Sequence, residues 1–222
     1  MAFSDLFSFR RKDDQNRDTG ADEPVHPTMA LERFVSALQT RPAPVLLDLG
    51  PVVGQNLTFF GDRLGCKIAV EDVLRDVERH AKDGKLEDLA VFFGGRFTKE
   101  AGSVDGILCW DVFDYLDKRA AGALAAALTL LLRPGGLLLA FFGTREPKPE
   151  APMGFTRYIV MDPARLQHRP YDGALSKRRP LQNRDVQRMF EPLRITEQFL
   201  LKTHVREVML RKPVDDRADA GL

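Results

Sequence analysis

Polar residues follow three apolar runs of the sequence, as expected for a ligand site at the edge of a parallel sheet. In open α/β sheets, ligands bind beyond the carboxyl ends of the strands. The three polar segments cover residues 48–56, 71–72 and 110–114. We therefore expect these segments to meet at one edge and to form one site.

Five residues of the first two segments could hold a polar ligand. Gly50 and Gly54 would let the backbone approach a ligand closely, because glycine adopts turn conformations closed to other residues. The helix expected to begin near Gln55 would offer free N–H groups. The Glu71 carboxylate could accept two hydrogen bonds from a vicinal diol, and Asp48 could bind an ammonium group directly or through water.

The third segment leaves two interpretations open at Trp110 and at Asp111. Asp111 could orient a substrate or act as a general base, or it could be a helix-start acid stabilised by the helix dipole. Trp110 could stack on a ligand or pack in the core. Other aromatic side chains could face a substrate or simply be buried: Tyr115, Tyr158, Tyr171, His168 and His204. The basic run 177–184 could meet an anionic substrate or be a solvated loop.

Hydrophobic periodicity predicts the elements that position these residues. Helices are predicted over 29–40, 55–65, 72–84, 117–132 and 183–191, with Asn56 and Asn183 as caps. Strands are predicted over 44–50, 67–71, 103–110, 136–143, 154–161, 193–201 and 204–213. Residues 85–102 fit either helix or strand. Strand and helix alternate over most of the chain, which indicates an α/β fold: a Rossmann-like, doubly wound, mostly parallel sheet with a C-terminal antiparallel hairpin.

The order and spacing of these segments resemble the class I S-adenosylmethionine (SAM)-dependent methyltransferases, of the type 11/12-like kind. The resemblance is carried by "DLGPVVG" at 48–54, "VED" at 70–72, "SVDGILCWDVFDYL" at 103–116 and "LLRPGGLLLAFF" at 131–142. It implies SAM as the cofactor and covers residues 29–212. It further implies cofactor-binding roles at Asp48, Gly50, Pro51, Gly54, Glu71, Asp72 and Trp110, and a catalytic role at Asp111.

Two departures from the family pattern keep a second function open. Val52 stands where the family has a glycine near the ligand, so the glycine loop is degenerate, and Pro51 removes one N–H donor. The segment 90–102 contains no obvious acid to read the adenine amino group. The chain is therefore expected either to transfer a methyl group to an unidentified acceptor, or to be a catalytically inactive binding or scaffolding protein. A nicotinamide-dependent oxidoreductase is disfavoured, because the loop lacks G-x-G-x-x-G.

Composition excludes several other classes of protein. The 33 basic and 32 acidic residues give a net charge of +1, which shows no strong nucleic-acid signature. Two cysteines and four histidines at scattered positions do not predict a disulfide framework or a metal site. With no long apolar run and no signal-peptide pattern, a cytoplasmic location is expected. Residues 1–28 read as a flexible arm, of which 1–12 could dock weakly on a membrane or protein partner, and 213–222 read as a polar tail.

Overall fold

The computed structural model describes residues 23–147 and 153–214 of the 222-residue chain. The expected docking segment 1–12, the remainder of the arm up to residue 22 and most of the polar tail lie outside the described residues.

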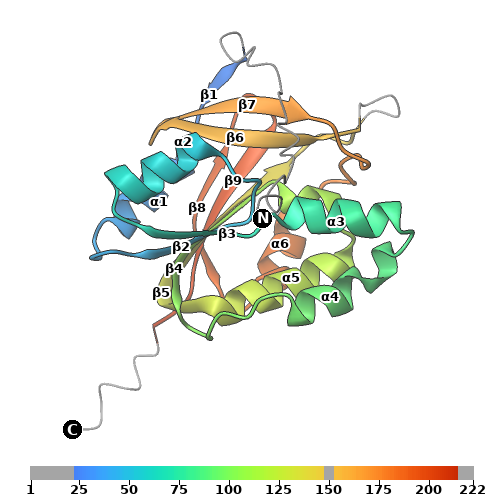
Figure 1. The fold of residues 1–222 in the computed structure, drawn as a ribbon, viewed down its shortest axis with the longest axis horizontal. Coiled ribbons are helices and arrows are strands. Elements are labelled where there is room, and N and C mark those ends of the chain that lie inside the picture. Colours follow the sequence, from blue (N-terminus) through green and yellow to red (C-terminus); the bar gives the residue numbers. More distant parts are fainter. Residues whose placement is uncertain (1–22, 148–152, 215–222) are drawn as a thin grey trace, which may run out of the picture.

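Six strands form the main sheet in the order β3-β2-β4-β5-β9-β8 (Figure 1). They span Val45–Asp48 (β2), Lys67–Val70 (β3), Val104–Trp110 (β4), Leu132–Gly143 (β5), Arg194–Leu200 (β8) and Val205–Arg211 (β9). The four strands from β3 to β5 are parallel, and β9 runs antiparallel to both of its neighbours. The predicted Rossmann-like sheet with a C-terminal antiparallel hairpin, β8–β9, is confirmed.

Helices cover both faces of this sheet, as the doubly wound fold requires. The helices are Ala30–Leu38 (α1), Gly54–Leu57 (α2), Val73–Lys82 (α3), Leu89–Gly95 (α4), Lys118–Leu131 (α5) and Asn183–Met189 (α6), and a π-helical segment, Thr58–Arg63, continues α2. The side chains of α3 to α6 bury one face in the larger hydrophobic cluster. Those of α1 and the π-helical segment bury the other face in a second cluster.

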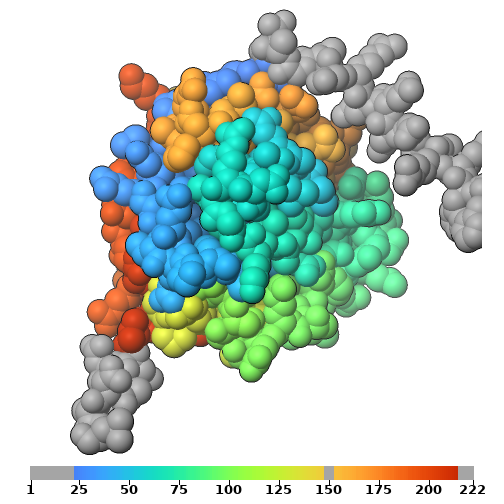
Figure 2. All heavy atoms as spheres, turned by 60° about the vertical axis from the view of Figure 1, so that its left-hand side comes forward, coloured from blue at the N-terminus to red at the C-terminus, as the bar shows by residue number. Residues whose placement is uncertain are grey.

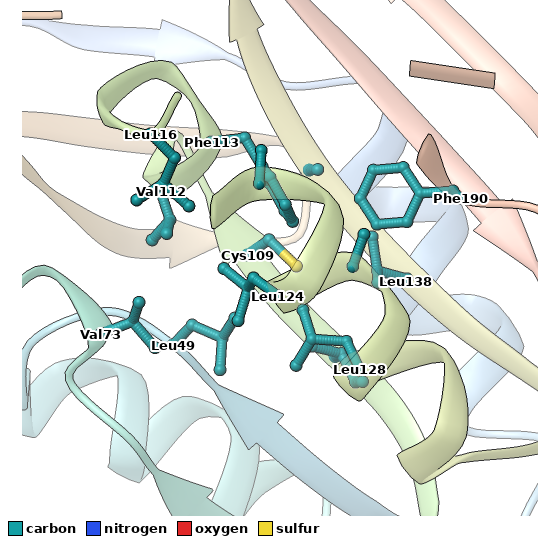
Figure 3. Close-up of a cluster of buried hydrophobic side chains, with 14 of the residues drawn as sticks. Leu49, Val73, Cys109, Val112, Phe113, Leu116, Leu124, Leu128, Leu138 and Phe190 are labelled. Carbon is teal, nitrogen blue, oxygen red and sulfur yellow. The ribbon is translucent and has the colours of Figure 1, made fainter. Parts of the chain in front are cut away.

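The centre of the sheet is buried on both faces, which explains its mostly apolar sequence. All seven residues of β4 are buried, as is typical of a central parallel strand. Figure 3 shows part of the larger cluster, in which Cys109 of β4 lies beside Leu124 of α5. On the opposite face, a Cβ at Gly106 would lie within 2.9 Å of Leu38 and Phe34, so this glycine allows α1 to approach the strand closely.

The ambiguous segment 85–102 contains a helix instead of a strand. It forms a short turn, Leu86–Asp88, followed by α4, which packs against α5 through Leu89 and Phe93. Among the described residues, β3 is therefore the outer strand of the main sheet on this side. Residues 85–102 form no strand, so they provide no strand-end acid to read the adenine amino group.

A second sheet of three strands, in the order β1-β7-β6, lies above the carboxyl edge of the main sheet (Figure 1). Its strands are Val25–Pro27 (β1), Arg165–Tyr171 (β7) and Phe155–Asp162 (β6). Only β6 was predicted. The expectation that the flexible arm extends to residue 28 is corrected, because β1 pairs with β7 and Thr28 is buried.

The predicted cap at Asn56 is wrong, and its real role is to attach α2 to this second sheet. Its side-chain amide donates to the Tyr158 carbonyl at 2.8 Å and accepts from the Val160 N–H at 2.8 Å. In the space-filling view, the cyan segment that contains α2 lies directly against the orange β6–β7 strands (Figure 2). The cap of α6 is also one residue earlier than predicted, at Gln182, whose N–H donates to Asp185.

Within residues 23–147 and 153–214, none of the helices combines the length and the apolar character that a membrane crossing requires.

Candidate functional site

The fold brings the three predicted polar segments to one edge of the main sheet. Asp48 ends β2, Glu71 and Asp72 follow β3, and Trp110 and Asp111 lie at the end of β4. Because β2 lies between β3 and β4, these residues occupy adjacent positions along the edge. Their side chains form three separate groups, and each group is held by hydrogen bonds or ion pairs to other residues of the chain.

The first group joins Asp48, Gly50 and Trp110. The carboxylate oxygen Oδ1 of Asp48 accepts hydrogen bonds from the Gly50 N–H at 2.9 Å and from the Trp110 indole Nε1 at 2.6 Å. Trp110 has a positive φ of 49°, which is unusual for a bulky residue. Its indole stacks on Tyr158 of β6, with ring centroids 5.3 Å apart and planes 4° from parallel.

The space above Gly50 is filled by this indole. A Cβ built on Gly50 would lie 2.9 Å from the Trp110 ring atoms Cδ1 and Nε1. Trp110 is 3% exposed and Tyr158 is 4% exposed, so both rings are buried. The group that lies close to Gly50 is thus the Trp110 side chain of the same protein. We call Trp110 and Tyr158, with Asp48 as their anchor, the aromatic plug.

Val52 and Gly54 of the glycine loop take no part in the aromatic plug. Val52 is 67% exposed, so it does not fill the site, contrary to what its position in the loop suggested. A Cβ on Gly54 would meet nothing within 4 Å. The side chain of Gln55, at the start of α2, donates to the Val160 carbonyl of β6 at 3.2 Å. The second sheet therefore covers this side of the loop.

Burial raises the pKa of the Asp48 carboxyl to about 6, although hydrogen bonds from Gly50 and Trp110 oppose the rise. The unfolded value is about 3.9, so the folded state binds this proton more tightly. The resulting stabilisation is fully present below about pH 3.9 and is lost as the pH rises through 6.

We expect the stability of Asp48→Asn relative to the native chain to increase by about 2–3 kcal/mol as the pH rises from about 4 to about 7.5. An amide oxygen can still accept from Gly50 and Trp110, and it carries no charge to bury. Urea unfolding at several pH values measures the gain. The control Asp83→Asn, at the exposed end of α3, should follow the native curve. A constant difference between Asp48→Asn and the native chain would contradict the prediction.

The second group joins Glu71, Arg96 and Asp76. Arg96, which follows α4, pairs with Glu71 through Nη1 at 2.8 Å and with Asp76 of α3 through Nε at 2.7 Å. The Glu71 side chain is 30% exposed, and its oxygen Oε2 is bonded to Arg96. Asp72 accepts from the Arg75 N–H at 3.0 Å and caps α3. Sequence reasoning missed Arg96, since nothing in the 85–102 segment indicated that it would fold back onto β3.

The third group joins Asp111, Asp114 and Lys177. The Lys177 Nζ lies 2.6 Å from Asp111 Oδ2 and 3.1 Å from Asp114 Oδ2. Burial acts to lower the pKa of Lys177, but the nearby carboxylates outweigh it and the pKa is raised. Asp111 is 1% exposed, so a role as general base would require Lys177 to move away from it. The basic run 177–184 thus supplies, through its first residue, a half-buried counter-charge to the two acids.

The other candidate side chains have structural contacts. The Tyr115 hydroxyl donates to the Gly154 carbonyl at 3.1 Å, and Tyr171 lies under the guanidinium of Arg157. His168 packs edge-on against Tyr158, and burial lowers the pKa of this histidine to about 4. His204 lies in the β8–β9 turn. No cluster of His, Cys, Asp or Glu suited to a metal ion occurs in the described part of the chain.

Comparison with known proteins supports the fold through structure alone. No protein-family model matches the sequence, and no curated protein matches it. Among solved structures, it is similar to the 1,6-didemethyltoxoflavin-N1-methyltransferase of Burkholderia thailandensis with bound 1,6-didemethyltoxoflavin and S-adenosylhomocysteine. That match has 17% identity, a TM-score of 0.51 and coverage of 89% of this chain and 82% of the other. The chain has the class I methyltransferase fold.

A second similar structure is a geranyl diphosphate methyltransferase in complex with GPP and sinefungin, with 12% identity and a TM-score of 0.50. The match covers 82% of this chain and 76% of that one. At these identities, the two matches establish the methyltransferase fold of this chain.

SAM is the cofactor that the methyltransferase fold implies, and the side chains present allow its fit to be tested. The resemblance places its methionine part against Gly50 and Asp48, where the Trp110 indole already lies beside Gly50 and donates to Asp48 Oδ1. The acid expected on the ribose, Glu71, is paired with Arg96 through Oε2. The arrangement described here therefore does not fit the methionine part of SAM.

Proposed function

We propose that this protein uses the methyltransferase fold as a binding or scaffolding module, and that its own side chains close the cofactor edge. The observation that carries the proposal is the Trp110 indole, which lies against Gly50 and is hydrogen-bonded to Asp48 at 2.6 Å. Methyl transfer in this fold depends chiefly on holding donor and acceptor in line. A site filled by a buried tryptophan cannot provide that position.

Moving Trp110 out of the aromatic plug costs free energy. Displacing Trp110 would expose a large aromatic surface, break its stack with Tyr158 and leave the buried Asp48 oxygen with one donor fewer. Loss of a buried tryptophan side chain costs about 3–5 kcal/mol. A ligand that has to supply this free energy binds about 10²- to 4 × 10³-fold more weakly, since each 1.4 kcal/mol is a factor of ten.

The second candidate is SAM-dependent methyl transfer to an unidentified acceptor. It is favoured by the placement of Asp48 and Glu71 at the ends of adjacent parallel strands. It is also favoured by the likeness in fold to a methyltransferase that holds S-adenosylhomocysteine. In this case the aromatic plug would have to leave the edge before the cofactor enters.

Calorimetric titration with SAM and with S-adenosylhomocysteine distinguishes the two candidates. Trp110 is the only tryptophan of the chain, so its fluorescence reports directly on the plug. The binding-module proposal expects no heat of binding and an unchanged, buried-type emission at high ligand concentration. Micromolar binding, a red-shifted emission and loss of both in Glu71→Ala would overturn it in favour of methyl transfer.

A cytoplasmic location is proposed as well. It is supported by two cysteines, Cys66 and Cys109, that are both buried and unpaired, as is usual in a reducing compartment.

A further inference from the structure

Two arginines face each other across the β6–β7 hairpin. Arg157 of β6 and Arg169 of β7 are directly opposite in the register of the antiparallel pair. Side chains at such positions lie on the same face of the sheet, with Cβ atoms about 4.5–5.5 Å apart. Like charges directly opposite are destabilising, so a pair of this kind needs an explanation.

Among the described residues, the two guanidinium groups lack acidic partners of the kind that Arg96 and Arg133 have. Both side chains are half-buried, and the Nε atom of each is buried without a hydrogen-bond partner. Within residues 23–147 and 153–214, no ion pair involves either arginine, whereas Arg165 on the same hairpin pairs with Asp162 at 2.7 Å.

The contacts that the two arginines do make hold them in place without neutralising them. Arg157 lies over the Tyr171 ring at 4.7 Å, and Arg169 donates through Nη2 to the Gln167 side chain at 3.3 Å. The nearby acid is Asp72: burial raises its pKa, and the charge of Arg157 is among the influences that lower it. Asp72 is already engaged as the cap of α3, and it forms no direct ion pair with Arg157.

We propose that Arg157 and Arg169 together bind the phosphate group of a small anionic ligand. Guanidinium groups present planar forks of N–H donors that match phosphate oxygens, and charge-assisted bonds of this kind are strong. A phosphate carries close to two negative charges at neutral pH, which balances the two arginines. The inference is independent of the proposed function, because neither arginine belongs to the aromatic plug.

Titration with inorganic phosphate, AMP and adenosine at constant ionic strength tests the proposal on the full-length protein. Isothermal calorimetry and the thermal unfolding midpoint are the two readouts. We expect phosphate and AMP to bind and to raise the midpoint, and adenosine to do neither. Equal affinities for phosphate and AMP would show that the free phosphate ion is sufficient for binding. A higher affinity for AMP would show that the ligand is a phosphate ester.

Single variants assign the site to the two arginines. Arg157→Gln and Arg169→Gln should each weaken phosphate binding by at least about tenfold, as expected when a charge-assisted contact is lost. Arg165→Gln removes one positive charge from the same hairpin and should bind phosphate as the native chain does. Without phosphate, Arg169→Gln should melt no lower than the native chain, because repulsion is relieved. No binding by the native protein, or equal weakening in Arg165→Gln, would overturn the proposal.

Discussion

Trp110→Ala is expected to lower the free energy of unfolding by about 3–5 kcal/mol, the usual cost of truncating a buried tryptophan. The side chain is 3% exposed, stacks on Tyr158, contacts Phe141 edge-on and donates to Asp48. The variant should retain a cavity bounded by Gly50 and Tyr158, because the surroundings of a truncated buried side chain relax only partially. Urea unfolding measures the loss.

The same variant should bind free indole, since the cavity keeps an aromatic wall and an acceptor for the indole N–H at Asp48. Indole is expected to restore part of the lost stability in Trp110→Ala and to leave the native chain unchanged. Trp110→Phe is the matched control: it keeps the stack, loses the hydrogen bond, and leaves little room for indole. A loss below about 1 kcal/mol, or no response to indole, would mean that Trp110 packs more loosely than its 3% exposure indicates.

Lys177→Met is expected to destabilise the protein by about 2–4 kcal/mol, because it leaves Asp111 and Asp114 buried without a counter-charge. Both carboxylates are at least 95% buried, at 1% and 5% exposure. The lysine side chain is 33% exposed, so its removal should cost less than that of a fully buried partner.

The deficit of Lys177→Met should depend on pH in a defined direction. Burial raises the pKa of Asp114 and the charge of Lys177 opposes this rise, so the pKa of Asp114 should rise further above its unfolded value of about 3.9 when Lys177 is removed. Groups with a raised folded pKa contribute stability that is present at low pH and lost as the pH rises. The deficit should therefore shrink as the pH falls from 7 towards 5.

A triple variant, Lys177→Met with Asp111→Asn and Asp114→Asn, should recover most of the stability at neutral pH. Replacing both buried charges with amides removes the need for a counter-charge. A triple variant as unstable as Lys177→Met would show that the lysine acts through packing and not through charge.

The sequence determined the main sheet because each of its strands is a local, strongly patterned segment. The mostly apolar run of β4 and the alternation of strand and helix were sufficient to predict a parallel sheet with helices on both faces. The polar residues that end β2, β3 and β4 were predicted to share one edge, and they do. This follows from topology alone, because parallel strands end on the same side.

Tertiary contacts decided the structure of the segments whose local sequence patterns are weak. Residues 89–95 form α4 because Leu89 and Phe93 pack with α5, although their sequence fits a strand equally well. β7 has charged and polar residues on both faces, so its pairing with β6 and β1 was not visible in its periodicity.

The state of the candidate site depended on contacts between distant parts of the chain. The Trp110–Asp48 hydrogen bond joins residues 62 apart, and the Lys177–Asp114 pair joins residues 63 apart. Sequence alone identified the groups that could do chemistry: the acids, the glycines and the tryptophan. Only the tertiary structure decided which partner each group has, because burial and hydrogen bonding are set by side chains brought in from other elements.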